Sequence, residues 1–271
     1  MPYTTLNLEI DSGLAHVTLC RPEALNTMTP DFWEEMIAVF GEIDARPDVR
    51  CVVIASTGKH FTAGLDLKSF ADLAADDRLD AGRLRELFRR KVMRMQESFS
   101  VIDRCRVPVI AVVQGGCIGA GVDLVTACDM RFVSRDAYFT IQEINIGIVA
   151  DVGTLQRMPD QVPPAIMREL AYTGRKFKAE EAERYGFVNG CADDHEGALA
   201  AGKAMAEEIA AKSPLAITGV KAVLNYSRDH DIQSGLDYVA TWNAGMLQGD
   251  DPLKAIQAVM TKQQASFKDL G

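Results

Sequence analysis

Three carboxylic acids stand where apolar, glycine-rich segments end, and they are the residues best placed to move protons. Asp123 follows the segment RVPVIAVVQGGCIGAGV, and Glu143 and Asp151 lie in YFTIQEINIGIVADVG. A carboxylate beside buried backbone costs free energy unless it is paired or used. Carboxyls crowded into an apolar pocket cannot all stay charged cheaply, so at least one should have a raised pKa and hold a proton ready to donate. The three acids therefore predict a proton-handling pocket.

Two glycine-containing segments could supply hydrogen-bond donors to this pocket. GKHFTAGLDL follows the apolar run at 50–56, and GGCIGAG follows the run at 108–114. Glycine lets the chain turn sharply and lets a substrate approach the main chain closely. A helix that opens after the second segment would direct free N–H groups, including that of Ala120, at developing negative charge. Together the segments could form an oxyanion hole with two donors.

Other interpretations of these features remain open. The second segment has the spacing GxxGxG instead of the dinucleotide-binding GxGxxG, and its glycines could serve only strand–helix packing. Asp123 could cap or pair locally near a helix start, and Asp151 could N-cap a helix through VGTLQRM. Glu143 could pair with Arg131 or Arg157.

Further polar residues carry weaker signals. His60 has no Ser or Cys nucleophile pattern beside it, so we expect a partly exposed loop residue and not a catalytic base. The basic residues between 83 and 94 favour a solvated helix face, with phosphate binding as the alternative.

Hydrophobic patterning predicts an α/β fold. Residues 5–20 alternate as two strands that turn at 11–13, and strands alternating with helices imply a largely parallel sheet with helices outside. The expected elements are a helix at 30–46, strands at 50–56 and 108–114, a helix at 119–128, and strands at 131–134 and 137–144. Beyond Gln156 the strand signals fade and helical spacing dominates. Residues 68–100 show no decisive pattern.

Composition excludes several classes of protein. With 271 residues, 48% of them hydrophobic, the chain can bury a large core. Its 29 Lys and Arg against 38 Asp and Glu give a net charge of −9, which disfavours nucleic acid as a partner. The six cysteines form no CxxC pair, which favours reduced core thiols over disulfides or a metal site. The ends carry no targeting signal and no apolar run is long enough for a membrane span, so we expect a cytoplasmic protein.

The segments HFTAGLDL, GGCIGAGVDLVTACDMRF and EINIGIVADVGTLQR resemble the enoyl-CoA hydratase/isomerase (crotonase) superfamily over nearly the whole chain. The resemblance implies a spiral core of ββα units at 1–200 and a helical trimerisation region at 201–271, with trimers that commonly pair as hexamers. It implies an acyl-CoA thioester whose carbonyl oxygen lies between the N–H groups of Leu65 and Ala120, and it implies no metal or redox cofactor. The matching substrate-binding positions are Ala24, Ala63, Gly64, Asp66 and Gly119.

The acids distinguish among members of this superfamily. Enoyl-CoA hydratases carry glutamates at the positions matching Asp123 and Glu143 and a glycine at that of Asp151. The set found here is similar to the Δ3,5-Δ2,4-dienoyl-CoA isomerases, whose reaction takes a proton from C2 and delivers one to C6. The resemblance makes Glu143 and Asp151 the base and acid, in either order, with Asp123 positioning or tuning them. The alternatives are an enoyl-CoA hydratase or Δ3-Δ2-enoyl-CoA isomerase, or a non-catalytic acyl-CoA-binding or RNA-associated protein.

Overall fold

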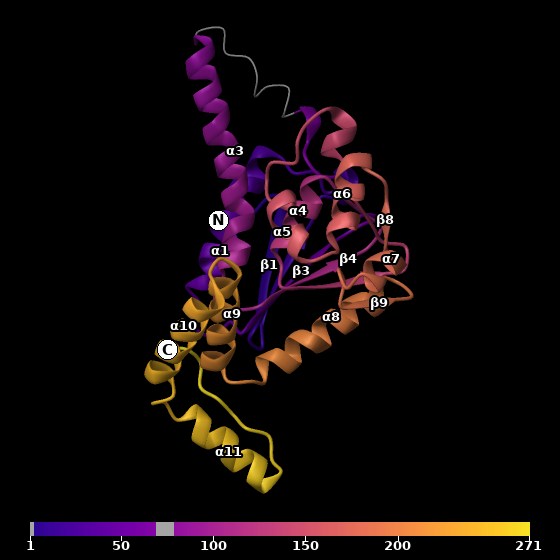
Figure 1. The fold of residues 1–271 in the computed structure, drawn as a ribbon. Coiled ribbons are helices and arrows are strands. Elements are labelled where there is room, and N and C mark those ends of the chain that lie inside the picture. Colours follow the sequence, from indigo (N-terminus) through magenta and orange to yellow (C-terminus); the bar gives the residue numbers. More distant parts are fainter. Residues whose placement is uncertain (1–2, 69–78) are drawn as a thin grey trace.

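The computed structural model describes residues 3–68 and 79–271, which fold around two sheets (Figure 1). The larger sheet consists, in spatial order, of β1 (Leu6–Asp11), β2 (Leu14–Leu19), β3 (Cys51–Ser56), β4 (Val109–Val113), β6 (Met130–Ser134) and β9 (Gly190–Ala192). Its first two strands are antiparallel and the other neighbours are parallel. The smaller sheet consists of β5 (Gly116–Ile118), β7 (Tyr138–Thr140) and β8 (Phe177–Lys178).

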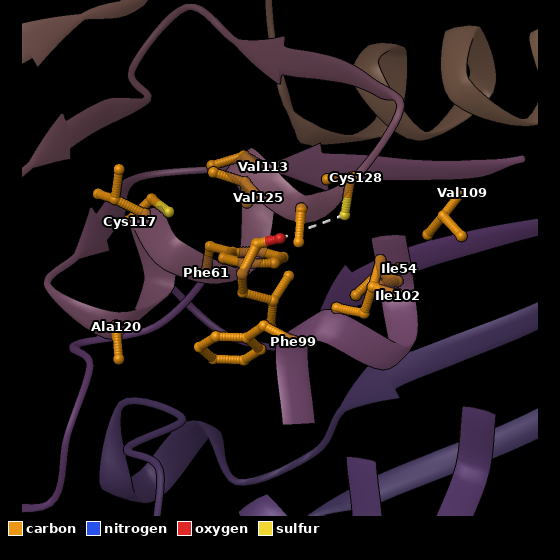
Figure 2. Packing of buried hydrophobic residues seen from close by; sticks show 14 of the residues in the cluster. Ile54, Phe61, Phe99, Ile102, Val109, Val113, Cys117, Ala120, Val125 and Cys128 are labelled. Atoms are coloured by element: carbon orange, nitrogen blue, oxygen red, sulfur yellow. Dashed lines mark hydrogen bonds between the residues drawn. The ribbon is translucent and has the colours of Figure 1, made fainter. Parts of the chain in front are cut away.

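The helices cover both faces of the larger sheet, because its central strands are apolar on both sides. Successive side chains of a strand point to opposite faces. Val52 and Ile54 of β3 therefore join the main core with the helices α1 (Pro30–Asp44), α3 (Ala81–Arg104) and α4 (Ala120–Ala127). Cys51 and Val53 face α8 (His195–Ala210), which packs along β3, β4 and β6. Figure 2 shows Phe61, Phe99 and Val125 packed together in the main core near Ala120.

Several expected elements differ from the structure. The strand expected at 137–144 ends at Thr140, and Glu143 instead begins a short 3-10 helix, η2 (Glu143–Ile146). The strands β8 and β9 lie beyond Gln156, where the sequence pattern had indicated helices alone. Both are too short, at two and three residues, to produce an alternating pattern. The long helix α3 occupies much of the segment for which no pattern was decisive.

Short helices lie before and after β8 of the second sheet. They are α5 (Thr154–Arg157), η3 (Met158–Asp160), α6 (Pro164–Thr173) and α7 (Ala179–Arg184). Of the helices in residues 3–68 and 79–271, none is both long and apolar enough to span a membrane.

Three helices form the C-terminal end of the molecule, and α11 extends away from the sheets (Figure 1). They are α9 (Pro214–Arg228), α10 (Ile232–Met246) and α11 (Asp251–Thr261). The buried Lys221 of α9 donates to Asp129 Oδ2 (2.7 Å) and to the carbonyl oxygens of Ile102 and Val107, which fastens α9 to the core. The division expected at residue 200 falls inside α8 and stays a prediction.

Candidate functional site

A pocket of about 320 Å³ opens between the two glycine-containing segments, α3 and η2. Two of the three predicted acids, Glu143 and Asp151, contribute to its wall. Most of the remaining wall is apolar, so charge inside the pocket is poorly solvated. The lining residues are Trp33, Ala63, Leu65, Leu67, Phe88, Met95, Ile118, Gly119, Ala120, Gln142, Glu143, Ile146, Ile148, Asp151 and Val152.

The two glycine-containing segments touch at the pocket. Gly64 has a φ of +83°, and a Cβ there would lie 2.5 Å from the carbonyl oxygen of Ile118 and 3.4 Å from the nitrogen of Ala120. Only a residue without a side chain permits this approach and this backbone conformation. The tertiary structure thus brings Leu65 and Ala120, which the sequence analysis paired, to one pocket.

Both expected oxyanion donors have backbone N–H groups that remain available. Ala120 is the first residue of α4, so its N–H has no acceptor within that helix. Leu65 forms a parallel bridge with Met28, but the bonds of the bridge use Gly64 O and Asp66 N. Among the described residues, neither N–H has a hydrogen-bond acceptor. Two residues from segments far apart in the sequence thus line the pocket, and the backbone N–H group of each has no acceptor among the described residues.

Glu143 lies against the second of these segments. Its Oε1 would be 3.2 Å from a Cβ on Gly119, the residue before Ala120, and Gly119 has a φ of +55°. Burial, together with the charges of Asp123 and Asp151, raises the pKa of Glu143 to about 7. At neutral pH this carboxyl is therefore able both to hold and to release a proton.

Asp123 lies behind the pocket and not on its wall. It is fully buried in α4, and its Oδ1 accepts a hydrogen bond of 2.6 Å from the backbone N–H of Thr154. Burial raises its pKa to about 6, although the bonds from Thr154 oppose the rise. Its Oδ2 has no hydrogen-bond partner among the described residues. Asp123 thus holds the first residue of α5, which is 31 positions away in the sequence, and this is not the local cap or pairing considered as an alternative.

Asp151 is half-buried in the loop that leads into α5. Burial is the main reason that its pKa is raised. The N-cap of α5 is Gly153, without a side-chain hydrogen bond, so the alternative in which Asp151 caps this helix is wrong. The backbone of Asp151 is held instead by Gln96 of α3, whose Nε2 donates to its carbonyl oxygen at 2.7 Å. Asp151 itself is one of the residues that line the pocket.

The two arginines considered as partners of Glu143 are engaged elsewhere. Arg131 donates to three backbone carbonyl oxygens, including that of Phe187 at 2.6 Å. Arg157 donates to Ser100 Oγ at 3.1 Å, and its guanidinium group lies directly over Gly153, where a Cβ would overlap it. Neither Arg131 nor Arg157 therefore neutralises Glu143, and this alternative is wrong.

The five residues expected to bind substrate occupy different places. Those on the wall of the pocket are Ala63 and Gly119. Gly64 supports the wall from behind. Ala24 ends the 3-10 helix η1 (Pro22–Ala24), and the next residue, Leu25, accepts a backbone hydrogen bond of 2.9 Å from Ala63. Asp66 accepts from the backbone N–H of Lys68 at 3.0 Å.

Sequence reasoning missed residues that shape or brace the site. Phe88 and Met95 of α3 form part of the apolar wall, and Gln96 and Thr154 hold the backbone around Asp151 and the carboxyl of Asp123. The spacing of seven between Phe88 and Met95 places both on one helix face and was a signal that could have found them. Nothing in the sequence marks Thr154, because its contribution is a backbone N–H.

The described residues contain no group of three or more His, Cys, Asp or Glu side chains arranged to hold a metal ion. All six cysteines are free thiols, four of them buried, as the sequence analysis expected for core cysteines.

Comparison with known proteins places these features in a family. The model of the enoyl-CoA hydratase/isomerase family matches residues 9–270. A peroxisomal Δ3,5-Δ2,4-dienoyl-CoA isomerase of Arabidopsis thaliana is 43% identical, over 99% of this chain and 98% of the relative. A mitochondrial enzyme of the same name from Homo sapiens is 46% identical, over 92% of this chain and 76% of the relative. The crystal structure of an enoyl-CoA hydratase from Mycobacterium smegmatis superposes with a TM-score of 0.86, at 28% identity, and covers 97% of this chain and 98% of that one.

These comparisons confirm one expectation and correct another. The crotonase fold is confirmed by the family match and by the superposition. The expectation of a cytoplasmic protein is wrong, because the relatives from Arabidopsis thaliana and Homo sapiens are named as peroxisomal and mitochondrial. Matched over most of its length by the family model, and similar over nearly all of it to a dienoyl-CoA isomerase and to a solved hydratase, the chain belongs to the enoyl-CoA hydratase/isomerase family.

Proposed function

We propose that the protein isomerises 3,5-dienoyl-CoA to 2,4-dienoyl-CoA. The observation that carries the proposal is that two carboxyls, Glu143 and Asp151, line one apolar pocket that also presents the N–H groups of Leu65 and Ala120. The relatives from Arabidopsis thaliana and Homo sapiens bear the name of this activity. Their similarity covers nearly all of this chain.

The proposed reaction moves one proton at each end of the diene. A carboxylate takes a proton from C2, and the electron pair spreads from the thioester oxygen to C6 as a dienolate. A second carboxyl then gives a proton to C6, which leaves double bonds at C2 and C4. C2 and C6 lie too far apart for one carboxyl to serve both. No electrons or atoms are gained or lost, so the reaction requires no redox cofactor, and the proposed steps use no metal.

The geometry supports an order for the two acids. Glu143 lies against Gly119, next to the Ala120 donor that would bind the thioester oxygen, so it is assigned as the base at C2. Asp151 is assigned as the acid at C6. The step requires a proton on Asp151, which is the direction in which burial moves its pKa, and a charge on the resting Glu143, whose pKa of about 7 permits both forms. Leu65 and Ala120 would stabilise the oxyanion, a contribution worth about 3–4 kcal/mol per donor in known enzymes.

The remaining candidate residues are assigned to binding the substrate or supporting the acids. We assign Asp123 to tuning, because it adds negative charge near Glu143 and holds α5 behind Asp151. The acyl-CoA would contact the positions matched to substrate binding in the family, which are Ala24, Ala63, Gly64, Asp66 and Gly119.

An enoyl-CoA hydratase is the main alternative, and the burial of Asp123 counts against it. In that alternative Asp123 and Glu143 together handle a water molecule. Asp123 is fully buried and does not belong to the described wall of the pocket, and one of its oxygens is occupied by Thr154. A non-catalytic acyl-CoA-binding protein would bury these three acids at a cost in free energy and would make no use of them.

The test follows the ultraviolet band of conjugated 2,4-dienoyl-CoA after purified protein is mixed with a 3,5-dienoyl-CoA, beside a hydration assay with a 2-enoyl-CoA. Growth of the band without appreciable hydration is expected. Glu143→Gln and Asp151→Asn should each lower turnover at least about 100-fold, while circular dichroism shows that they are folded. Full turnover in both folded variants would refute the proposal, and hydration alone would support the hydratase.

For the C-terminal helices we propose a homotrimer, or a hexamer of two trimers, with the subunit contact at α9–α11. An apolar groove of about 420 Å³ lies among these helices and contains Leu224 and Trp242. On α11, Val259 and Met260 are 80% and 79% exposed, which is unusual for large apolar side chains that solvent alone would cover. In an assembly of identical chains, the exposed apolar side chains of one copy can cover the groove of another.

Light scattering coupled to gel filtration tests this assembly. The wild type should have three or six times the mass of one chain. Val259→Asp should reduce it to one, whereas Lys203→Asp, on the exposed face of α8, should not. A wild type with the mass of one chain would refute the assembly.

A further inference from the structure

The two segments that carry the expected oxyanion donors are joined by backbone hydrogen bonds. The N–H of Phe61 donates to Gln114 O (2.9 Å), that of Thr62 to Gly116 O (3.1 Å), and that of Ile118 to Thr62 O (3.1 Å). This pairing ends three residues before Leu65 and two before Ala120. The positions of those two N–H groups relative to each other therefore depend on how firmly the segments are held together.

One side chain adds to this pairing. The backbone N–H of Gly116 donates to Nδ1 of His60 at 2.9 Å. The neighbouring Gly115 has a φ of +54°, and a Cβ there would lie 2.7 Å from the same Nδ1 and would overlap the carbonyl oxygen of Lys59. The second segment thus lies directly on His60, and the absence of a side chain at Gly115 is what permits it.

The hydrogen bond defines the state of the imidazole. A ring nitrogen that accepts a hydrogen bond carries no proton, so His60 is the neutral tautomer with its proton on Nε2. Its Nδ1 lone pair is occupied by Gly116 and is not free to take a proton from a substrate. His60 is also not among the described residues that line the pocket. From the sequence His60 was expected to be a partly exposed loop residue and not a catalytic base; in the structure its ring accepts a hydrogen bond from the second segment.

Buried polar groups also hold the backbone of His60 in place. Its carbonyl oxygen accepts from Asn26 Nδ2 (3.2 Å) and from Ser56 Oγ (3.3 Å). Gln114 Nε2 donates to the same Ser56 hydroxyl at 3.0 Å. Asn26, Ser56 and Gln114 are all buried, so moving His60 would leave several polar groups without partners. His60 is therefore held in position, and the second segment packs against its imidazole.

We infer that His60 is a positioning residue, which sets the separation of the Leu65 and Ala120 N–H donors by holding the backbone of Gly116. The inference rests on the proposed function, because it assumes that a thioester oxygen binds between these donors. Stabilisation of an oxyanion depends on donors that are already in place when the charge develops. Loss of the acceptor should therefore lower kcat about 10- to 100-fold and leave KM within about 3-fold, since a misplacement of about 1 Å can cost that much in rate.

The experiment compares three variants with the wild type. His60→Leu removes the acceptor, His60→Asn keeps an acceptor oxygen near the position of Nδ1, and His16→Leu removes a half-buried imidazole from β2 as a control. Each is assayed for kcat and KM with a 3,5-dienoyl-CoA. In addition, the absorption band of bound 2,4-dienoyl-CoA is recorded, because donors at the carbonyl oxygen pull electron density along the conjugated system and move the band to longer wavelength.

The expected result is a large band shift in the wild type, His60→Asn and His16→Leu, and a reduced shift with lowered kcat in His60→Leu. If His60→Leu does not fold, His60→Ser takes its place, since its hydroxyl is too short to reach Gly116. The inference is overturned if the variant without an acceptor keeps the wild-type kcat and band shift, if His60→Asn is as impaired as that variant, or if bound dienoyl-CoA shows no shift in the wild type. A wild type that shifts the band but does not convert the substrate would refute the proposed isomerase and leave the positioning role supported.

Discussion

Glu143→Gln should make the protein more stable at alkaline pH while it removes the proposed base. The reason is that burial, together with the charges of Asp123 and Asp151, raises the pKa of Glu143 to about 7. The folded protein therefore holds a proton on this carboxyl at pH values where the unfolded chain has lost it. A charged Glu143 opposes folding, and a neutral glutamine of nearly the same shape does not.

The magnitude of this gain in stability follows from the difference in the pKa of Glu143 between the unfolded and folded states. A rise from the ordinary value of 4.5 to about 7 corresponds to about 3 kcal/mol, at about 1.36 kcal/mol per pKa unit. Because the pKa of Glu143 is raised on folding, its contribution to the stability of the folded state is fully present at acid pH. This contribution is lost as the pH increases through about 4.5 to 7. The advantage of Glu143→Gln should thus be below about 1 kcal/mol at pH 5 and about 3 kcal/mol at pH 8. In a chain of this size it should raise Tm by about 6–10 °C at pH 8.

Urea and thermal unfolding of both proteins at pH 5 and pH 8 provide the assay. Protein concentration is kept constant, because an oligomer gains apparent stability with concentration. Glu181→Gln serves as the control of opposite sign. Arg175 donates to both oxygens of Glu181, at 2.7 and 2.8 Å, and holds the pKa of that carboxyl below its usual range. This variant should gain no stability at pH 8.

Equal differences between wild type and Glu143→Gln at the two pH values would refute the reasoning, as would a loss of stability at pH 8. Either result would mean that Glu143 is well solvated or has a partner that stabilises its charge. The pKa of the proposed base would then not lie near neutrality.

Three further results are expected. Gly119→Ala should lower kcat/KM at least about 10-fold, because the φ of +55° at this position is strained for alanine and the added Cβ would press on the carboxyl of Glu143. The control is Gly41→Ala, on the open surface of α1, which should raise the free energy of unfolding by about 0.5–1 kcal/mol in urea. Lys221→Met should cost about 3 kcal/mol in the same measurement, since it removes the ammonium group that pairs with the partly buried Asp129 and donates to two carbonyl oxygens; an unchanged unfolding midpoint would contradict this. Titration with a thiol reagent should label the exposed Cys20 fastest, with the four buried cysteines reacting only on unfolding.

Much of the fold could be predicted because local patterns dominate its central elements. The runs that became β3 and β4 are continuous apolar segments bounded by turns, and they admit few other structures. The paired strands β1 and β2 followed from alternation over twelve residues. The short strands β8 and β9 have no local signal, because only their neighbours β7 and β6 make them strands.

The chemical types at the candidate site were also evident from the sequence. Three acids among glycines and apolar residues imply a pocket in which carboxyls are poorly solvated, and the positive φ at Gly64 and Gly119 is what such glycines permit. The role of each acid was not evident. Asp123 and Asp151 have similar local surroundings, yet one is fully buried against Thr154 and the other faces the pocket.

The sequence by itself thus determined which groups could transfer protons and which segments could turn closely enough to present backbone donors. Only the tertiary structure decided how these groups are combined. Leu65 meets Ala120 because Gly64 packs on Ile118, and α3 supplies Phe88 and Met95 to the wall. The physical reason is that local residue types determine backbone conformation and burial tendency, whereas the direction in which a carboxyl or an N–H points depends on packing between segments distant in the chain.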